Sequence, residues 1–485
     1  MQIQINHRAE LTLDLYHRVA WQGHGVRFGA LARQCMEESR RDFIRLIDGD
    51  PHITIYGVTS GYGQQASLRL QGEARLKHAR KPPRSTVAAF GTPAPERVAR
   101  GIVLARLANF IEGHAAVSPE LAAKIAALLD GGALPKVSVE GQGGAGEILW
   151  AAPLFLAVAE QFPLAEKDAL SLVNGSPAAS ALVADAALAM RRRLDLAEAV
   201  FALSAEAIKA PLEAYAAEFE ALWDDPYETA ALRSLRHLLE GGGQERRAYQ
   251  APVSYRILPR VIGQFRRTIT QAEEIAAGSL ASVTDNPVFL RPDPGRPDPR
   301  HPYGRVYSNG GYHNARACPA LDNLAAACAD LCALAERHST KLLDGRYSLL
   351  PDQLQAGEGY IGILGFVQVG YAEQARRSAQ RTFLPGSEAG GFGQNDVAPL
   401  TGLAWRGQEE AGYCLDAALA MLAVIASQAF HVTERDAPPA LRGLLQEIRA
   451  IFPPVIAARA YPEQLSALTA HFRAAIYDVA DVVRD

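Results

Sequence analysis

The chain has 485 residues, of which 48% are hydrophobic and 21% are charged. This composition is ordinary for a soluble globular protein and excludes wholesale disorder. The 49 Lys and Arg residues nearly balance the 53 Asp and Glu residues, so the net charge of −4 gives no reason to expect a nucleic-acid partner. The longest apolar run, residues 148–159, is shorter than the roughly 20 residues that a membrane-spanning helix needs. We therefore expect no membrane segment.

The N-terminus and the cysteines indicate the compartment. The first six residues lack the basic and apolar regions of a secretory signal. The chain has 5 cysteines, an odd number scattered along its length, which favours a reducing setting over a disulfide framework. We therefore expect a cytoplasmic protein.

Helical periodicity dominates the chain. A short strand-like alternation at residues 52–56 is followed by long helical stretches at residues 178–210, 320–343, 358–378 and 408–430. Long helices joined by short links predict a mostly α fold with a helix-bundle core. We place a boundary near residue 205. It would separate a glycine-looped N-terminal active-site domain, residues 1–205, from a long-helix bundle domain, residues 206–485.

Glycine-rich segments interrupt the helical pattern at residues 56–63, 141–146, 241–243 and 390–393. Glycine is favoured where the backbone needs a positive φ or a close approach to a neighbour. The stretch at 241–243 is expected to belong to a mobile loop. A further loop at residues 291–304 is rich in proline and should be a stiff, exposed excursion between two elements.

These loops and several short motifs resemble the aromatic amino acid ammonia-lyases, the histidine ammonia-lyase family. The matching pieces stand in the family's order at residues 56–63, Gln71 with His78, 135–149, 174–176, 254–256, 284–287, 308–313 and 394–396. The resemblance implies a mostly α, ammonia-lyase/fumarase-like long-helix bundle that forms a homotetramer. Its active sites would combine loops from more than one subunit. It also implies small amino acid substrates, from which members of the family eliminate ammonia or in which they shift the amino group.

The chain departs from this family at the position of the family's electrophile. That electrophile, 4-methylidene-imidazol-5-one, forms autocatalytically from an internal Ala-Ser-Gly. Here the family's Gly-Ala-Ser-Gly-Asp-Leu aligns with residues 144–149, and Gly146 stands at the serine position. Glycine has no β-hydroxyl to lose, so we expect no such prosthetic group, and we identify no other cofactor and no metal site. Ordinary histidine or phenylalanine ammonia-lyase activity is therefore not expected.

The resemblance assigns catalytic and binding roles to several residues. Tyr56 matches the family's catalytic base, and Arg256 matches the arginine that binds the substrate carboxylate, a contact that suits a planar guanidinium. Asn174 matches the asparagine that binds the electrophile. Without that group it would hold the loop at 144–147 or a substrate carbonyl, or would only cap a helix. A second catalytic tyrosine of the family is replaced by Val253.

Five further residues are expected to line the substrate site through the same resemblance. His78 would contact the substrate side chain, and Tyr312 would add a hydroxyl where many members have phenylalanine. Glu373 matches an acidic residue of histidine-using members, and Gln394 and Asn395 resemble an amide-containing stretch near the substrate. The alternatives are that His78 is only a structural histidine and that Glu373 is a solvated carboxylate on a helix.

Glu147 replaces the family's glycine directly after the missing serine, at the expected start of a helix. A carboxylate there gains from the helix dipole and could act as an acid, a base or a substrate anchor. A simple N-terminal capping role is the equal alternative.

Three functional interpretations follow from these residues. The leading one is an enzyme that acts without the prosthetic group, by acid–base elimination, cyclisation or isomerisation of an amino acid or a derived carboxylate. Tyr56 and Glu147 would then move protons, and Arg256 would bind the carboxylate. The second is a catalytically inactive relative that binds a ligand or a partner. The third is an ammonia-lyase with an unforeseen electrophile.

Overall fold

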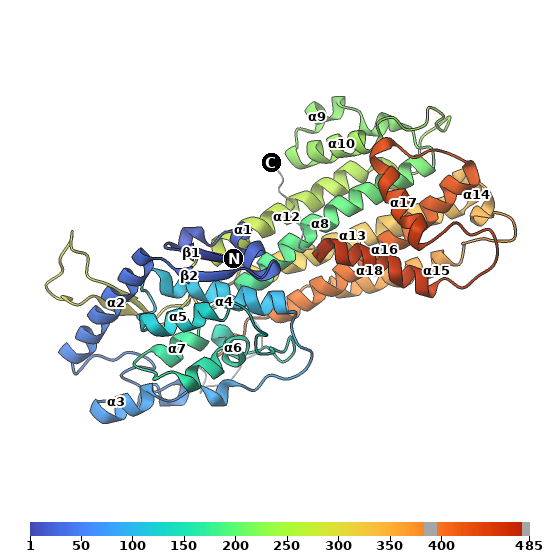
Figure 1. The fold of residues 1–485 in the computed structure, drawn as a ribbon. Helices are drawn as coiled ribbons and strands as arrows, with labels where there is room; N and C mark the ends of the chain where they lie inside the picture. The colour runs from blue at the N-terminus through green and yellow to red at the C-terminus, as the bar shows by residue number, and fades with distance from the viewer. Residues whose placement is uncertain (383–394, 478–485) are drawn as a thin grey trace. The chain divides into compact units, whose positions relative to one another are not determined.

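The computed structural model describes residues 1–382 and 395–477, and its chain forms two compact units (Figure 1). Unit 1 comprises Met1–Asp185, Ala272–Ala320 and Thr382–Arg406. Unit 2 comprises Ala186–Gln271, Leu321–Arg381 and Gly407–Asp485. The units interleave along the chain, whereas the sequence led us to expect one boundary near residue 205. The division near residue 205 stays a prediction about domains.

Unit 1 combines short helices with two small sheets. In the first sheet β1 (Gln2–Ile5) and β2 (Gly25–Phe28) are parallel, with Gln2 opposite Gly25. In the second, β3 (Val288–Leu290) and β4 (Arg305–Tyr307) are antiparallel, and the proline-rich loop joins them (Figure 1). The helices that lie wholly in this unit are α1 (Leu13–Tyr16), α2 (Ala30–Gly49), α3 (Gly72–Ala79), α4 (Glu96–Ile111), α5 (Pro119–Ala127), α6 (Ile148–Gln161) and α7 (Asp168–Val173).

Helix α4 is the buried centre of unit 1. Its residues from 98 to 111 are all buried, including Arg100 and Arg106. A helix that is buried on every face must satisfy its polar side chains within the protein. The Arg100 guanidinium does so by donating to the carbonyl oxygens of Val19 and Leu129, at 2.8 and 3.1 Å. Arg106 points toward the loops of the candidate site described below.

Unit 2 is built on long helices, and the boundaries between the units fall inside them. These are α8 (Pro177–Ala207), α12 (Leu258–Leu280), α13 (Ala317–Leu343) and α16 (Thr401–Thr433). The other helices of unit 2 are α9 (Glu218–Trp223), α10 (Pro226–Leu239), α11 (Val253–Arg256), α14 (Gly345–Ser348), α15 (Leu364–Ser378), α17 (Arg442–Ile451) and α18 (Pro462–Tyr477).

Helix α8 contacts several of these helices through buried polar side chains. Arg193 forms a two-pronged ion pair with Asp416 of α16, at 2.8 and 2.9 Å, and both side chains are fully buried. Glu198 accepts hydrogen bonds from Arg266 of α12. A buried charge is tolerated only with such a partner, so these pairs fix which helices lie beside α8.

The mostly α, long-helix fold expected from the sequence is confirmed. The stretches expected to be helical correspond to α8, α13, α15 and α16, although α15 begins only at Leu364. The strand expected at 52–56 is wrong. The backbone of this segment forms hydrogen bonds within its own loop and not with another strand. The Ile55 N–H donates to Thr59 Oγ1 at 2.7 Å, and the Ile55 carbonyl accepts from the Thr59 N–H at 3.0 Å.

Three helical segments are long and apolar enough to cross a membrane by length and composition alone. They are Asp168–Ala207, Ala317–Leu343 and Thr401–Thr433, and their most apolar windows are 94%, 67% and 94% buried inside the protein. The sequence expectation relied on uninterrupted apolar runs and missed these segments, because single polar residues break each run. Burial against other helices accounts for their apolar character.

Candidate active site

A cavity of about 650 Å³ in unit 1 is lined by five residues that the sequence marks as site residues. They are Tyr56, His78, Asn174, Tyr312 and Asn395. These residues come from the first glycine loop, from α3, from the end of α7 and from two later segments of the chain. Residues far apart in sequence thus meet around one hollow, which is the usual form of a small-molecule site.

The backbone of its own loop holds Tyr56 in place. The phenolic oxygen accepts a hydrogen bond from the Gly63 N–H at 3.0 Å, and the ring meets that of Tyr62 edge-on, with centroids 6.2 Å apart. Gly57 has a φ of 69°, and a Cβ at this position would lie 2.4 Å from the Tyr62 ring. Only glycine therefore lets the two tyrosines pack this closely.

His78 presents a neutral ring to the cavity. Burial lowers its pKa and the charge of Lys81 lowers it further, against a hydrogen bond to the Gly57 backbone that raises it. The imidazole is therefore uncharged at neutral pH. Its ring lies 4.6 Å from that of Tyr62, and Nε2 is buried without a hydrogen-bond partner in the described part of the chain. That nitrogen is available to a ligand.

Gly146 lies against Asn174 at the position where the family has serine. Its φ is 77°, and a Cβ built there would lie 2.3 Å from Asn174 Oδ1. The Asn174 side chain is itself held, because its Nδ2 donates to the Asn286 carbonyl at 2.8 Å. The Gly175 N–H holds the Gly146 carbonyl at 3.1 Å. These contacts fit glycine at residue 146, because a Cβ there would require Asn174 to move.

Glu147 caps α8 rather than its own helix. The buried carboxylate accepts hydrogen bonds from the N–H groups of Ala178 and Ala179, at 2.8 and 3.1 Å, in the first turn of α8. Burial raises the pKa of Glu147 to about 8, although those N–H groups and the charge of Arg106 lower it. Glu147 is not among the described residues that line the cavity. Its contacts support a structural role.

A buried charged cluster packs behind Asn174. The fully buried Arg106 donates to the carbonyl oxygens of Ser171 and Asn174, and burial lowers its pKa only to about 10. Lys167 and Asp285 form an ion pair with fully buried side chains, and the Ser171 hydroxyl donates to Asp285 at 3.0 Å. The cluster fixes the end of α7 and therefore the position of Asn174.

The cavity lining is polar and favours anions. Lys81 is its one charged side chain among the described lining residues, and none of these is Asp or Glu. Tyrosine, asparagine and serine side chains add hydrogen-bond donors, while Ile148 and Leu170 add apolar surface. A cavity with surplus donors and one cation suits a small polar compound that carries a carboxylate.

Besides Glu147, Arg256 and Glu373 are expected site residues that do not line this cavity in the described structure. Arg256 belongs to unit 2, where it is exposed and its Nε donates to the Ala251 carbonyl at 3.1 Å. Glu373 also belongs to unit 2, where it is exposed on α15 and lies 3.3 Å from Arg376. Gln394 lies outside the described residues.

Sequence reasoning missed several residues that line the cavity, among them Lys81, Tyr62 and Asn286. Tyr62 and Asn286 belong to segments that resemble the family, and Lys81 lies three residues after His78. Each lies in or beside a segment that resembles the family, and that position was the available signal. Their contact with the cavity depends on how the loops fold together.

The mostly α fold and a cavity lined by distant segments suit a protein that acts on a small molecule, and the comparisons with known proteins give its family. A model of the aromatic amino acid lyase family matches residues 11–161 and 151–450, so the chain belongs to that family. It is 30% identical over 362 residues to histidine ammonia-lyase of Streptomyces griseus, a match that covers 67% of either chain. Histidine ammonia-lyase of Streptomyces coelicolor is 27% identical over 441 residues, 82% of either chain. The tyrosine aminomutase of Streptomyces globisporus shares the fold, with a TM-score of 0.87, 22% identity and 98% coverage of each chain.

The buried Glu147 carboxyl predicts a pH-dependent contribution to stability. Folding raises its pKa from an ordinary 4.5 to about 8, so the contribution is fully present below pH 4.5 and is lost as the pH rises through about 8. Glu147→Gln removes this titration. The unfolding free energy of the wild type should therefore fall relative to that of the variant between about pH 5 and about pH 9.

Urea unfolding at a series of pH values measures this difference. The exposed Glu120→Gln variant is the matched control. A difference between wild type and Glu147→Gln that does not change with pH would contradict the assignment.

Proposed function

We propose that this chain is an enzyme of the aromatic amino acid lyase family that works without the family's internal electrophile. The observation that carries the proposal is Gly146, which has no side chain to dehydrate and a left-handed φ of 77°. The place that a Cβ would take lies 2.3 Å from Asn174 Oδ1. Without the electrophile, the reaction depends on proton transfer and charge stabilisation by the side chains of the cavity.

The proposed substrate is an amino acid or a derived compound with a carboxylate. Tyr56 would take a proton from an acidic carbon, and elimination, cyclisation or isomerisation would follow. Lys81 would offset the negative charge that develops when the proton leaves, and His78 Nε2 would accept a hydrogen bond from the substrate. We assign Glu147 a positioning role instead of the proton transfer first considered, since its carboxylate is engaged by α8.

Assembly of the site requires a second subunit in this proposal. Arg256 lies in unit 2, and the resemblance implies active sites built from several subunits of a homotetramer in the cytoplasm. Exposed apolar side chains on and beside α15 support an interface, among them Phe366 at 78%, Ile363 at 48% and Val369 at 46% exposure. Large exposed apolar side chains of this kind commonly mark protein contacts.

The family also suggests a second candidate, a catalytically inactive relative that binds a ligand or a partner. The replacement of the family's loop tyrosine by Val253, together with Gly146, favours this alternative. Tyr56, Asn174 and the donor-rich cavity favour retained chemistry. An ammonia-lyase with an unforeseen electrophile is the third possibility, and the mass measurement below tests it.

The mature chain should carry no internal ring. Its intact mass should equal that of the unmodified sequence, because Gly146 cannot lose a hydroxyl. Peptide mapping should return the segment containing residues 145–147 unmodified. A deficit of two water molecules located in that segment, or any other modification there, would refute the proposal.

The protein should be a homotetramer in solution. The exposed apolar side chains of α15 would be buried between subunits, which gives the free energy for assembly. Light scattering coupled to size-exclusion chromatography measures the molar mass. A monomer at all working concentrations would remove the shared site from the proposal.

Tyr56 and Arg256 should affect different steps. Tyr56→Phe removes only the hydroxyl, so turnover should slow while ligand binding is largely kept. Arg256→Ala should weaken binding of a carboxylate ligand by about 1.5–3 kcal/mol, the scale of a hydrogen bond to a charged group. Steady-state kinetics and calorimetry with the substrate measure the two effects. Wild-type turnover by Tyr56→Phe would contradict the mechanism, and a bound ligand without any turnover would favour the inactive relative.

A further inference from the structure

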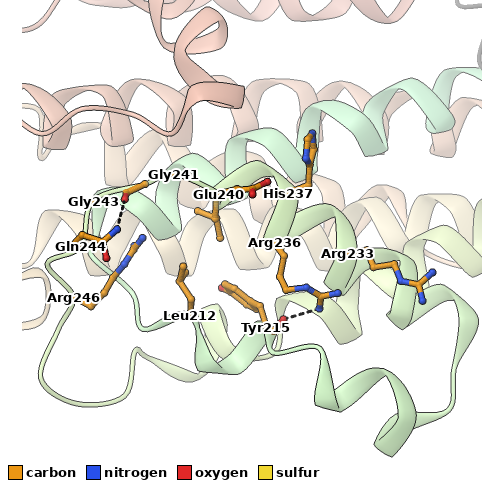
Figure 2. A pocket seen from close by; sticks show the side chains of 12 residues that line it. Leu212, Tyr215, Arg233, Arg236, His237, Glu240, Gly241, Gly243, Gln244 and Arg246 are labelled. Atoms are coloured by element: carbon orange, nitrogen blue, oxygen red, sulfur yellow. Dashed lines mark hydrogen bonds between the residues drawn. The ribbon is translucent and has the colours of Figure 1, made fainter.

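The segment that leads to Arg256 is fastened to the end of α8. This segment, residues 241–256, is called the arm below. Figure 2 shows its first part, where Gly243, Gln244 and Arg246 lie beside a cavity of about 770 Å³ that side chains of α10 also line. Its glycines led us to expect a mobile loop, and its contacts are those of an anchored one.

Glu206 of α8 is the centre of the anchorage. Its fully buried carboxylate accepts a hydrogen bond from the Gly243 N–H at 3.0 Å. The same carboxylate forms ion pairs with Arg246 at 2.8 Å and with Arg435 at 2.6 Å. Arg435 also donates to the carbonyl oxygens of Gly243 and Glu245, at 3.2 and 3.1 Å. A buried carboxylate with two cations is costly to expose, so this part of the arm should open rarely.

A second anchor lies at the other end of the arm. Tyr255 is fully buried, and its ring stacks on that of His338 with centroids 3.6 Å apart and planes 18° apart. The Tyr255 hydroxyl lies 3.2 Å from the Ser204 hydroxyl of α8, and the Tyr255 carbonyl accepts from the Tyr215 hydroxyl at 2.8 Å. Burial lowers the pKa of His338 to about 3, so its ring is neutral and stacks without charge.

Both anchors precede Arg256, and the second is directly beside it. This residue directly follows Tyr255, its side chain is exposed, and its Nε is held by the Ala251 carbonyl at 3.1 Å. Its two terminal nitrogens have no partner within the described residues, so the fork of the guanidinium is open to a ligand. Holding a binding group in place before the ligand arrives lowers the entropic cost of binding.

We propose that Glu206 and Tyr255 are positioning residues that hold the arm as a fixed platform for Arg256. The arm would then act as a rigid receptor for the substrate carboxylate and not as a lid that opens and closes. A lid needs low local stability, whereas this segment is tied by a buried ion network at one end and a buried stack at the other. The inference rests on the proposed role of Arg256 as the carboxylate-binding residue.

Hydrogen exchange and limited proteolysis of the full-length protein test whether the arm is fixed. In the wild type, the hydrogen-bonded amides of Gly243, Arg247 and Tyr255 should be protected, and trypsin should cleave slowly after Arg246 and Arg247. Glu206→Gln keeps the size of the side chain but removes its charge. It should speed both amide exchange of the arm and its cleavage by trypsin by at least about tenfold. Glu245→Gln, which removes an exposed pair with Lys209 and leaves the contacts of Glu206 in place, is the matched control.

Two further variants and one control measurement distinguish loss of the anchors from a general folding defect. Arg435→Gln weakens the same anchor from the other side, and Tyr255→Phe keeps the ring stack but removes the hydroxyl. Exchange in α4 of unit 1 should be unchanged in all variants, which shows that the rest of the fold is intact. Equal exchange of the arm in wild type and in both Glu206→Gln and Arg435→Gln would overturn the proposal.

Calorimetry with trans-cinnamate, an aromatic carboxylate, tests the link to Arg256. Arg256→Ala should weaken binding by about 10- to 150-fold without loosening the arm, and Glu206→Gln should weaken binding about tenfold while loosening it. If the arm is protected but Glu206→Gln binds cinnamate as tightly as the wild type, the platform role is overturned. If the wild type and Arg256→Ala bind cinnamate equally, the carboxylate role of Arg256 in the proposed function fails, whatever the exchange data show.

Discussion

The missing β-carbon at position 146 is the constraint on which the candidate site depends. The left-handed backbone there brings Gly146 against Asn174 Oδ1, and the Asn174 amide is in turn fixed by the Asn286 carbonyl. The buried cluster around Arg106 holds the same asparagine from behind. This close approach, which only glycine permits, therefore helps to position Asn174 in the cavity wall. The chemistry proposed for the cavity follows from the absence of a serine side chain at residue 146.

Buried carboxylates perform the same task at two places in the fold. Glu147 in unit 1 accepts from the first N–H groups of α8, and Glu206 in unit 2 accepts from the Gly243 N–H and from two arginines. In both cases a glycine-rich segment, flexible by composition, is held by a carboxyl group that solvent does not reach. Hydrogen bonds to these buried groups compensate for the flexibility that the composition predicts.

The sequence predicted the long helices and the loops well, because helical periodicity and glycine clusters are local signals. It also marked Tyr56, His78 and Asn174, which the fold brings to one cavity. Its errors concern contacts between distant segments. Glu147 was predicted either to act as an acid, a base or a substrate anchor or to cap the helix that follows it, and it caps a helix that begins 30 residues later. The alternation at 52–56 looked like a strand, and no local pattern reveals that its backbone bonds close within the loop.

The capping contact of Glu147 also bears on how this chain could have diverged from ring-bearing relatives. Restoring an Ala-Ser-Gly at residues 145–147 takes a serine at 146 and a glycine at 147, and each change has its own cost. The serine would meet Asn174, and the glycine would leave the buried first turn of α8 without its carboxylate. Each change disturbs a different buried contact, so either substitution alone should destabilise this chain. An internal Ala-Ser-Gly at this place would therefore need compensating changes in both Asn174 and the first turn of α8.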